Sequence, residues 1–159
     1  MKKVRCLIVD DEPMARKILD GFLAKIDSLE VVGTCRNAIE AFNYIASNKI
    51  DLVFLDVNMP EISGLSFAKS INKEIKIIFT TAHREYAVDG FDLQAVDYLL
   101  KPVSFERLQQ AIYKYLGVVK EIAEQKPIEQ VNVKVDFFFV KSDRKMIKIN
   151  FTEICFVES

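Results

Sequence analysis

The chain has 159 residues, of which 50% are hydrophobic, and a formal net charge of −1. This length holds one full domain and a remainder, and the apolar content is enough for a proper core. No apolar run approaches the roughly 18 residues that a membrane span needs, and Met1-Lys2-Lys3 passes directly into a strand pattern without a signal-peptide stretch. We therefore expect a soluble protein located in the cytoplasm.

Strand and helix patterns alternate along the first 120 residues. The strand patterns cover residues 4–9, 30–35, 51–55, 75–79 and 95–100. Such an alternation is typical of a parallel sheet that helices cover on both faces.

The first three helical patterns have clear start signals. The first helix has Pro13 in its first turn, the second is capped by Asn37, and a short third helix follows Gly64. The residues predicted to face the core from the first two helices are Ala15, Ile18, Leu19, Phe22, Leu23, Ile26, Ala38, Ala41, Phe42 and Ile45.

The last two helical patterns differ in strength. The fourth, about residues 84–91, is weak because Gly90 interrupts it, which suits a switching segment of low local stability. The final helix begins after Ser104, a good N-cap. Its predicted core residues are Phe105, Leu108, Ala111, Ile112, Tyr115 and Leu116.

The cysteines show no metal-binding spacing. Cys6 lies in a strand, Cys35 at a strand end and Cys155 near the end of the chain. We expect buried, reduced thiols rather than ligands or disulfides.

Chemically active side chains stand at the ends of four strands: Asp10 and Asp11, Asp56, Thr81, and Lys101. Because the carboxyl ends of parallel strands lie along one edge of a sheet, these side chains would converge into one pocket. Carboxylates held that closely repel each other, so Mg²⁺ is the natural guest. The lysine adds a point charge that suits a carboxylate or a phosphate.

This set of residues favours a site that accepts a phosphoryl group on an aspartate. Asp56 is the candidate nucleophile, because it ends the central strand between the acid pair and the Thr81 and Lys101 strands. Mg²⁺, the lysine and the threonine hydroxyl would neutralise charge on the phosphoryl oxygens. Single acids at strand ends are common, and Asp10-Asp11 alone would also suit a helix cap. Five such positions in one register are much harder to obtain by accident.

Four blocks of sequence carry a resemblance to a known family. They are Val9-Asp10-Asp11-Glu12-Pro13, Leu55-Asp56-Val57-Asn58-Met59-Pro60 with Gly64, Thr81-Ala82, and Tyr98-Leu99-Leu100-Lys101-Pro102. With them, residues 1–120 resemble a response-regulator receiver domain. The resemblance implies a flavodoxin-like, doubly wound α/β fold with a five-stranded parallel sheet in the order 2-1-3-4-5.

The resemblance also implies the roles of the acidic residues. Asp10, Asp11 and Asp56 would hold Mg²⁺ together with the backbone carbonyl of Asn58. The phosphohistidine of a sensor histidine kinase would supply the phosphoryl group to Asp56. Such a domain is a phosphoacceptor rather than an enzyme, although it assists its own phosphotransfer and dephosphorylation.

The remaining implied roles concern switching. Thr81 would be the switch hydroxyl, Lys101 the cation that pairs with phosphate, and Tyr98 an aromatic whose exposure changes when Thr81 moves. From the residues alone, Tyr98 could also be a strand aromatic packed against the last helix. His83 could tune water access to the phosphoaspartate or be merely solvated. The resemblance further suggests a cis Lys101-Pro102 bond.

The composition changes after the last predicted helix of the receiver. Residues 121–134 read as a linker, and residues 136–141 and 146–149 read as a hairpin with a turn at 142–145. A third strand is predicted at 154–157. Residues 135–159 resemble the opening strands of a LytTR-type DNA-binding domain and are too few to close a core, so we expect the chain to be part of a longer protein.

The expected partners follow from this organisation. The whole protein would be a response regulator that binds DNA and regulates transcription, and we expect a homodimer with no membrane partner. From residue 118 onward, seven basic residues (Lys120, Lys126, Lys134, Lys141, Arg144, Lys145, Lys148) balance seven acidic ones (Glu121, Glu124, Glu129, Asp136, Asp143, Glu153, Glu158). No basic footprint is visible, so we expect no specific DNA binding by residues 1–159. The apolar run at 137–140 would favour pairing with another chain.

Three rival functions use similar residues or folds. A haloacid-dehalogenase-type phosphohydrolase would need an aspartate where Asn58 stands. A dinucleotide enzyme would need glycines after the first strand, and Asp10 to Ala15 contains none. The stronger rival is a phosphorelay or protein-binding receiver without DNA output.

Overall fold

The fold is described from a computed structural model, which describes residues 2–86, 95–124, 137–142 and 145–150. The chain divides into two compact units, Met1–Glu124 and Gln125–Ser159. Most of the helix predicted at 84–91, the strand predicted at 154–157, and Cys155 lie outside the described residues.

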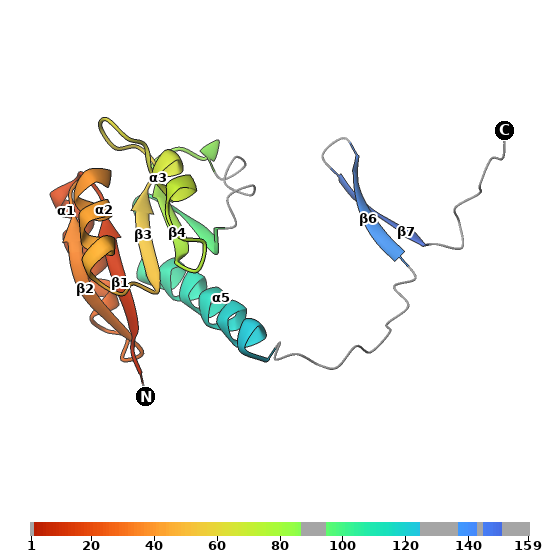
Figure 1. The fold of residues 1–159 in the computed structure, drawn as a ribbon, viewed down its shortest axis with the longest axis horizontal. Helices are drawn as coiled ribbons and strands as arrows, with labels where there is room; N and C mark the ends of the chain where they lie inside the picture. Colours follow the sequence, from red (N-terminus) through yellow and green to blue (C-terminus); the bar gives the residue numbers. More distant parts are fainter. Residues whose placement is uncertain (1, 87–94, 125–136, 143–144, 151–159) are drawn as a thin grey trace. The chain divides into compact units, whose positions relative to one another are not determined.

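The first unit contains a five-stranded parallel sheet in the order β2-β1-β3-β4-β5 (Figure 1). The strands are β1 (Val4–Val9), β2 (Leu29–Cys35), β3 (Leu52–Asp56), β4 (Lys76–Thr81) and β5 (Asp97–Leu100). This order confirms the predicted flavodoxin-like fold. Successive strands are added on one side of β1 (β2) and then on its other side (β3, β4, β5), so the strand order reverses at β1. In α/β sheets, the ligand crevice lies at such a reversal.

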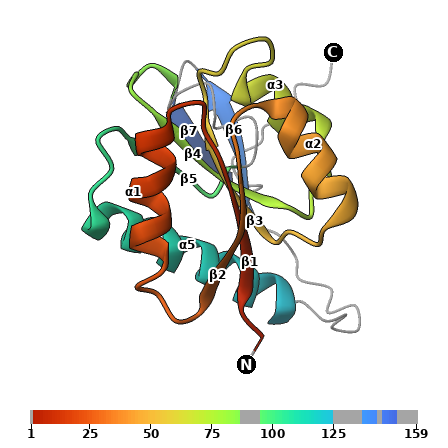
Figure 2. The ribbon, with the colours of Figure 1, turned by 90° about the vertical axis from the view of Figure 1, so that its left-hand side faces the viewer.

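The helices form one layer on each side of the sheet. They are α1 (Pro13–Leu23), α2 (Ala38–Ser47), α3 (Gly64–Ser70) and α5 (Phe105–Glu124). Figure 2 shows α1 and α5 on one side of the sheet and α2 and α3 on the other. Among the described residues, no helix combines the length and apolar character needed to cross a membrane.

Side-chain caps explain where three of these helices begin. The Asn37 side chain accepts the backbone N–H of Glu40 at 2.8 Å, and Ser63 does the same for Ser66 at 3.1 Å. Ser104 accepts the backbone N–H of Arg107 at 3.2 Å. The caps predicted at Asn37 and Ser104 are thus confirmed, and each satisfies a backbone donor that the helix leaves unpaired.

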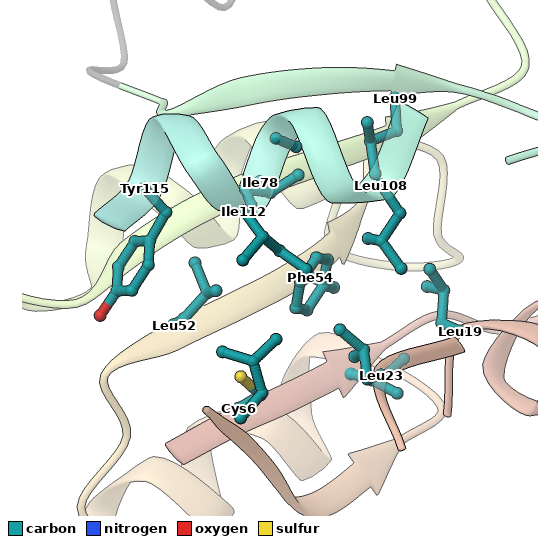
Figure 3. Close-up of a cluster of buried hydrophobic side chains, with 13 residues drawn as sticks. Cys6, Leu19, Leu23, Leu52, Phe54, Ile78, Leu99, Leu108, Ile112 and Tyr115 are labelled. Carbon is teal, nitrogen blue, oxygen red and sulfur yellow. The ribbon is translucent and has the colours of Figure 1, made fainter. Parts of the chain in front are cut away.

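The hydrophobic core forms one cluster on each face of the sheet. In Figure 3, Leu108, Ile112 and Tyr115 of α5 point toward the strand residues Leu52, Phe54 and Ile78. The second cluster lies under α2 and α3 and includes Leu7, Val53, Leu55, Phe67 and Phe79.

Two predicted core residues are exposed, so their assignment was wrong. Ile18 of α1 is 42% exposed and Leu116 of α5 is 36% exposed. Both lie at the margin of their helix's apolar stripe and line surface pockets rather than the core.

The described cysteines agree with the expectation of buried thiols. Cys6 and Cys35 are both free and buried. Burial is the main cause that raises the pKa of Cys6 to about 12 and that of Cys35 to about 11. Neither thiol is a ready nucleophile at neutral pH.

The second unit contains a two-stranded antiparallel hairpin formed by β6 (Phe137–Ser142) and β7 (Lys145–Asn150). This confirms the hairpin predicted in the tail. Helix α5 runs to Glu124, past the expected end of the receiver at residue 120.

Candidate functional site

Four strand ends bring the predicted site residues to one edge of the sheet. Asp10 follows β1, Asp56 ends β3, Thr81 ends β4, and Lys101 follows β5. The first three are almost completely buried, with exposed fractions of 0%, 3% and 2%. Since buried charge is costly unless it is paired, the charges at this edge must be balanced locally.

Lys101 supplies part of that balance. Its Nζ lies 2.9 Å from Asp10 Oδ2, 2.9 Å from Glu12 Oε1 and 3.5 Å from Asp56 Oδ1. The backbone N–H of Lys101 donates to the carbonyl of Thr81 at 2.7 Å, which fixes the start of this loop against the end of β4. The following Lys101-Pro102 bond is cis, as the family resemblance suggested.

Four carboxylates surround one small volume. Asp10, Asp11, Glu12 and Asp56 each offer an oxygen, and these oxygens lie within 4.8 Å of one another. A single lysine cannot neutralise four carboxylates, and an all-oxygen donor set suits a hard divalent cation. The donor chemistry therefore fits Mg²⁺, and three of the four acids are the predicted ligands.

The electrostatics of Asp56 reflect this excess of negative charge. Burial and the charge of Asp10 raise the pKa of Asp56 to about 7, with a further contribution from Asp11, while Lys101 opposes the rise. Burial alone would lower the pKa of Lys101, but its hydrogen bonds to Asp10 and Glu12 outweigh this effect and raise it. Lys101 is therefore a permanent cation, whereas Asp56 is held with difficulty as an anion.

The loop after β1 is built to present the acid pair. The backbone N–H of Glu12 donates to Asp10 Oδ1 at 2.9 Å, and the Arg16 guanidinium donates to the Asp10 carbonyl at 2.6 Å. These bonds hold Asp10 inward while Asp11, beside it, is exposed.

The loop after β3 depends on a glycine. The backbone N–H of Gly64 donates to the Val57 carbonyl at 2.9 Å. A Cβ on Gly64 would lie 2.0 Å from the Asp56 carbonyl oxygen, so no other residue fits without moving the backbone of Asp56.

Thr81 lies at the neighbouring strand end, but its hydroxyl is engaged elsewhere. Thr81 Oγ1 accepts the backbone N–H of His83 at 3.1 Å and lies 3.4 Å from the His83 carbonyl oxygen. The His83 side chain is half exposed and lies 3.7 Å from Glu85 Oε1, so it points to the surface.

Tyr98 is partly buried and stacks on Phe79, with ring centroids 5.1 Å apart. It belongs to the core cluster under α2 and α3. The alternative prediction that Tyr98 packs against the last helix is therefore wrong, because α5 covers the opposite face.

The sequence prediction missed one residue of this site. Glu12 stands directly after the acid pair and contacts Lys101 as closely as Asp10 does. The signal was present in the Asp10-Asp11-Glu12 run, but the contact depends on how the loop enters α1, which periodicity does not reveal. Asn58, the fourth predicted ligand, is exposed two positions beyond Asp56.

Comparison with known proteins agrees with this geometry. A family model described as "Response regulator receiver domain" matches residues 6–113. The chain belongs to the response regulator receiver family. The buried acids and the lysine described above all lie within the matched residues.

Two curated relatives are longer than this chain. It is 42% identical over 113 residues to "Transcriptional regulatory protein BtsR" of Salmonella typhi, in a match that covers 70% of this chain and 47% of that protein. It is 37% identical over 143 residues to "Sensory transduction protein LytR" of Staphylococcus haemolyticus, covering 88% of this chain and 55% of that protein. The receiver chain thus spans about half the length of the curated relatives it matches.

A solved structure is also similar. The response regulator TrrA of Thermotoga maritima, described as a complex with Mg²⁺-BeF, shares 37% identity with a TM-score of 0.61. The match covers 72% of this chain and 98% of that one.

Proposed function

We propose that this chain is the phosphoacceptor part of a two-component response regulator, in which Asp56 receives a phosphoryl group from the phosphohistidine of a sensor histidine kinase. The observation that carries this proposal is the position of the Lys101 ammonium, 3.5 Å from Asp56 Oδ1 and 2.9 Å from Asp10 Oδ2. A fixed cation beside a buried carboxylate is what a phosphoryl acceptor needs, because negative charge accumulates there.

In the proposed step, a carboxylate oxygen of Asp56 attacks phosphorus. The bond from phosphorus to the kinase imidazole breaks, the nitrogen keeps the electron pair, and an acyl phosphate forms on Asp56. Lys101 would then donate to a phosphoryl oxygen, and the Thr81 hydroxyl would leave His83 and donate to another. The chain is not an enzyme in this scheme, because its own residue is modified.

We propose Mg²⁺ as the cofactor, held by Asp10, Asp11 and Asp56 and by the backbone carbonyl of Asn58. The ion would neutralise charge on the phosphoryl oxygens. The four clustered carboxylates and the elevated pKa of Asp56 support this assignment, since both express an excess of negative charge.

The proposed switch links Asp56 to an interaction face. The phosphoryl group on Asp56 would carry a charge of about −1.5 to −2 at neutral pH, in place of the single charge of the carboxylate. We propose that Thr81 follows this charge, that Tyr98 responds to the movement of Thr81, and that the resulting change favours a homodimer. The stacking of Tyr98 on Phe79 of β4 supports a connection, because Phe79 and Thr81 belong to the same strand.

We further propose that residues 1–120 form the receiver, that 121–134 form a linker, and that 135–159 begin a LytTR-type DNA-binding domain of a cytoplasmic transcription regulator. The names of the BtsR and LytR relatives support a regulatory output. DNA would then be a partner of the longer protein. A relay or adaptor receiver without DNA output is the alternative, and the reading frame beyond Ser159 would separate the two.

Phosphorylation by acetyl phosphate tests the proposal. We expect labelling of the wild-type chain with Mg²⁺ and background labelling with EDTA or in Asp56→Asn. Asp11→Ala should label weakly because it binds Mg²⁺ less tightly, which titration calorimetry measures. Asp20→Asn, which removes an exposed acid of α1, is the matched control and should label normally. Undiminished labelling of Asp56→Asn would refute the assignment.

A further inference from the structure

Glu12 gives Lys101 a third carboxylate partner, which the proposed phosphoryl transfer does not use. Its Oε1 lies 2.9 Å from Lys101 Nζ, whereas Asp56 Oδ1 lies at 3.5 Å. In the resting protein, Lys101 is therefore closer to Glu12 than to the phosphoacceptor.

The three carboxylates around Lys101 differ greatly in burial. The side chains of Asp10 and Asp56 are 1% and 4% exposed, whereas that of Glu12 is 63% exposed. A carboxylate that is already in contact with water can leave its partner and be rehydrated at little cost, but a buried one cannot. Glu12 is thus the partner that Lys101 can exchange.

The backbone of Glu12 is held at the start of α1 by hydrogen bonds, and its side chain extends to Lys101. Its N–H donates to Asp10 Oδ1 at 2.9 Å, and its carbonyl accepts the N–H of Arg16 at 3.2 Å as α1 begins. Glu12 is the N-cap residue of α1, yet its side chain makes no capping hydrogen bond and reaches Lys101 instead.

There is also space beside this ion pair. A pocket of about 360 Å³ is lined by Glu12 and Lys101 together with apolar residues of α1, such as Met14 and Ile18. The Glu12 carboxylate can therefore move away from Lys101 without displacing the core.

We propose that Glu12 competes with the phosphoryl group on Asp56 for Lys101 and so favours the unphosphorylated state of the receiver. This inference rests on the proposed function. Lys101 has three N–H donors and three carboxylate neighbours in the resting protein, so a phosphoryl oxygen competes with these neighbours for its N–H groups. Glu12 stabilises only the resting arrangement and not the phosphorylated one. It is therefore a positioning residue, and its loss favours the phosphorylated arrangement.

Removal of Glu12 has two separable effects. Glu12→Gln breaks the charged contact with Lys101, but it also removes a negative charge near an incoming anion. Glu12→Asp keeps the charge and shortens the side chain, so it isolates the contact. Glu61→Gln neutralises an exposed acid in the loop after Asp56 and controls for charge alone.

The test uses the full chain with Mg²⁺ and fluoroberyllate, an analogue of the phosphoryl group, with affinity measured by ¹⁹F NMR. We expect Glu12→Gln and Glu12→Asp each to bind fluoroberyllate about two- to fivefold more tightly than wild type, the range for a partly exposed ion pair. Glu61→Gln should change the affinity by less than about 1.5-fold, since water and salt screen it. Thermal melts should show that all three variants are folded.

The NMR signal of the Lys101 ε-methylene group, recorded without fluoroberyllate, reports whether the contact between Lys101 and residue 12 is broken. It should shift in both Glu12 variants and stay unchanged in Glu61→Gln. Unchanged fluoroberyllate affinity in Glu12→Gln would overturn the proposal. A second outcome would also overturn it: Glu12→Gln binds fluoroberyllate more tightly, whereas Glu12→Asp binds it as wild type does although its Lys101 signal has shifted. That pattern would show an effect of the removed charge and not of the lost contact. If no variant, including wild type, binds fluoroberyllate, the proposed function itself fails.

Discussion

Asp56 is the residue at which burial and function oppose each other. The carboxylate is 3% exposed and faces Asp10, so its charge is costly in the absence of a metal. Because its pKa is raised to about 7, the folded state binds a proton more tightly than the unfolded state does. Folding stability should therefore fall as the pH rises from the ordinary aspartate range through 7.

Replacement of Asp56 should remove this cost. In EDTA at pH 8, we expect Asp56→Asn to be more stable than wild type by about 2 kcal/mol. This value is smaller than the free energy that corresponds to the whole pKa shift, because solvent screens the charge of Asp56. The gain should vanish near pH 3, below the ordinary aspartate pKa of about 3.9, where both folded and unfolded states of wild type carry a mostly protonated Asp56. Urea unfolding at the two pH values measures this difference. Equal stability of the two proteins at pH 8 would contradict the electrostatic account.

Much of the site was predictable at this scale, because strand ends converge in a parallel sheet whatever the loops do. Asp10, Asp56 and Lys101 met as expected. Glu12 did not emerge from the sequence because its contact depends on the path of the loop into α1. Thr81 reached the expected edge, but its hydroxyl partner, the backbone of His83, is a local turn contact that spacing alone does not reveal.

At the scale of elements, the turn from β3 into α3 determines where Asp56 stands. Gly64, the first residue of α3, packs directly on the backbone of Asp56. Two other glycines, Gly21 in α1 and Gly117 in α5, have open space around the position of a Cβ. The same substitution should therefore have opposite effects in the two settings.

We expect Gly64→Ala to destabilise the fold by about 2 to 3 kcal/mol through overpacking and to lower labelling by acetyl phosphate, because the Asp56 backbone must move. Gly21→Ala, the matched control in an open helical position, should be neutral or stabilise by up to about 1 kcal/mol. Chemical denaturation and the labelling assay check both variants. Normal labelling of Gly64→Ala would show that the turn does not position the acceptor.

Asp97 connects β5 to α5. Its carboxylate oxygens lie 2.7 and 2.8 Å from the guanidinium nitrogens of Arg107 and 3.2 Å from Lys114 Nζ. Arg107 also donates to the Tyr98 carbonyl at 3.0 Å. Burial alone would raise the pKa of Asp97, but the hydrogen bonds from Arg107, Tyr98 and Lys114 outweigh it and lower the pKa.

Because this pKa is lowered, Asp97 should contribute stability above its ordinary pKa of about 3.9 and lose that contribution as the pH falls further. We expect Asp97→Asn to cost about 1 to 2 kcal/mol at pH 7, with a smaller difference from wild type below pH 4. The exposed Arg36–Glu40 pair is the control, and Glu40→Gln should lower the free energy of unfolding by much less than Asp97→Asn does, because water and salt screen this pair. A difference for Asp97→Asn that grows on acidification would contradict this sign.

The starts of the helices could be predicted better than the residues that each helix buries. Caps at Asn37 and Ser104 located two of the starts, since a polar cap is encoded within a few residues. Periodicity then assigned too wide a stripe to the core, because it does not say how much of a helix the sheet covers. Ile18 and Leu116 were placed inside for that reason, and both are exposed.

For the whole molecule, the sequence predicts more about the first compact unit than about the second. The receiver match covers residues 6–113, and the sheet, its order and its helices follow from that part of the sequence. The tail contributes a hairpin, which local turn and strand signals could predict. An output function could not be derived in the same way, because a hairpin alone carries no chemistry that selects a ligand.

Mapping the modified residue is the most direct test of the central proposal. The chain is treated with acetyl phosphate and Mg²⁺, borohydride reduces any aspartyl phosphate to homoserine, and peptide mass spectrometry locates the change. We predict modification at Asp56 alone, and none in EDTA. Homoserine at Asp10 or Asp11 with Asp56 intact, or no modification with Mg²⁺ present, would contradict the account.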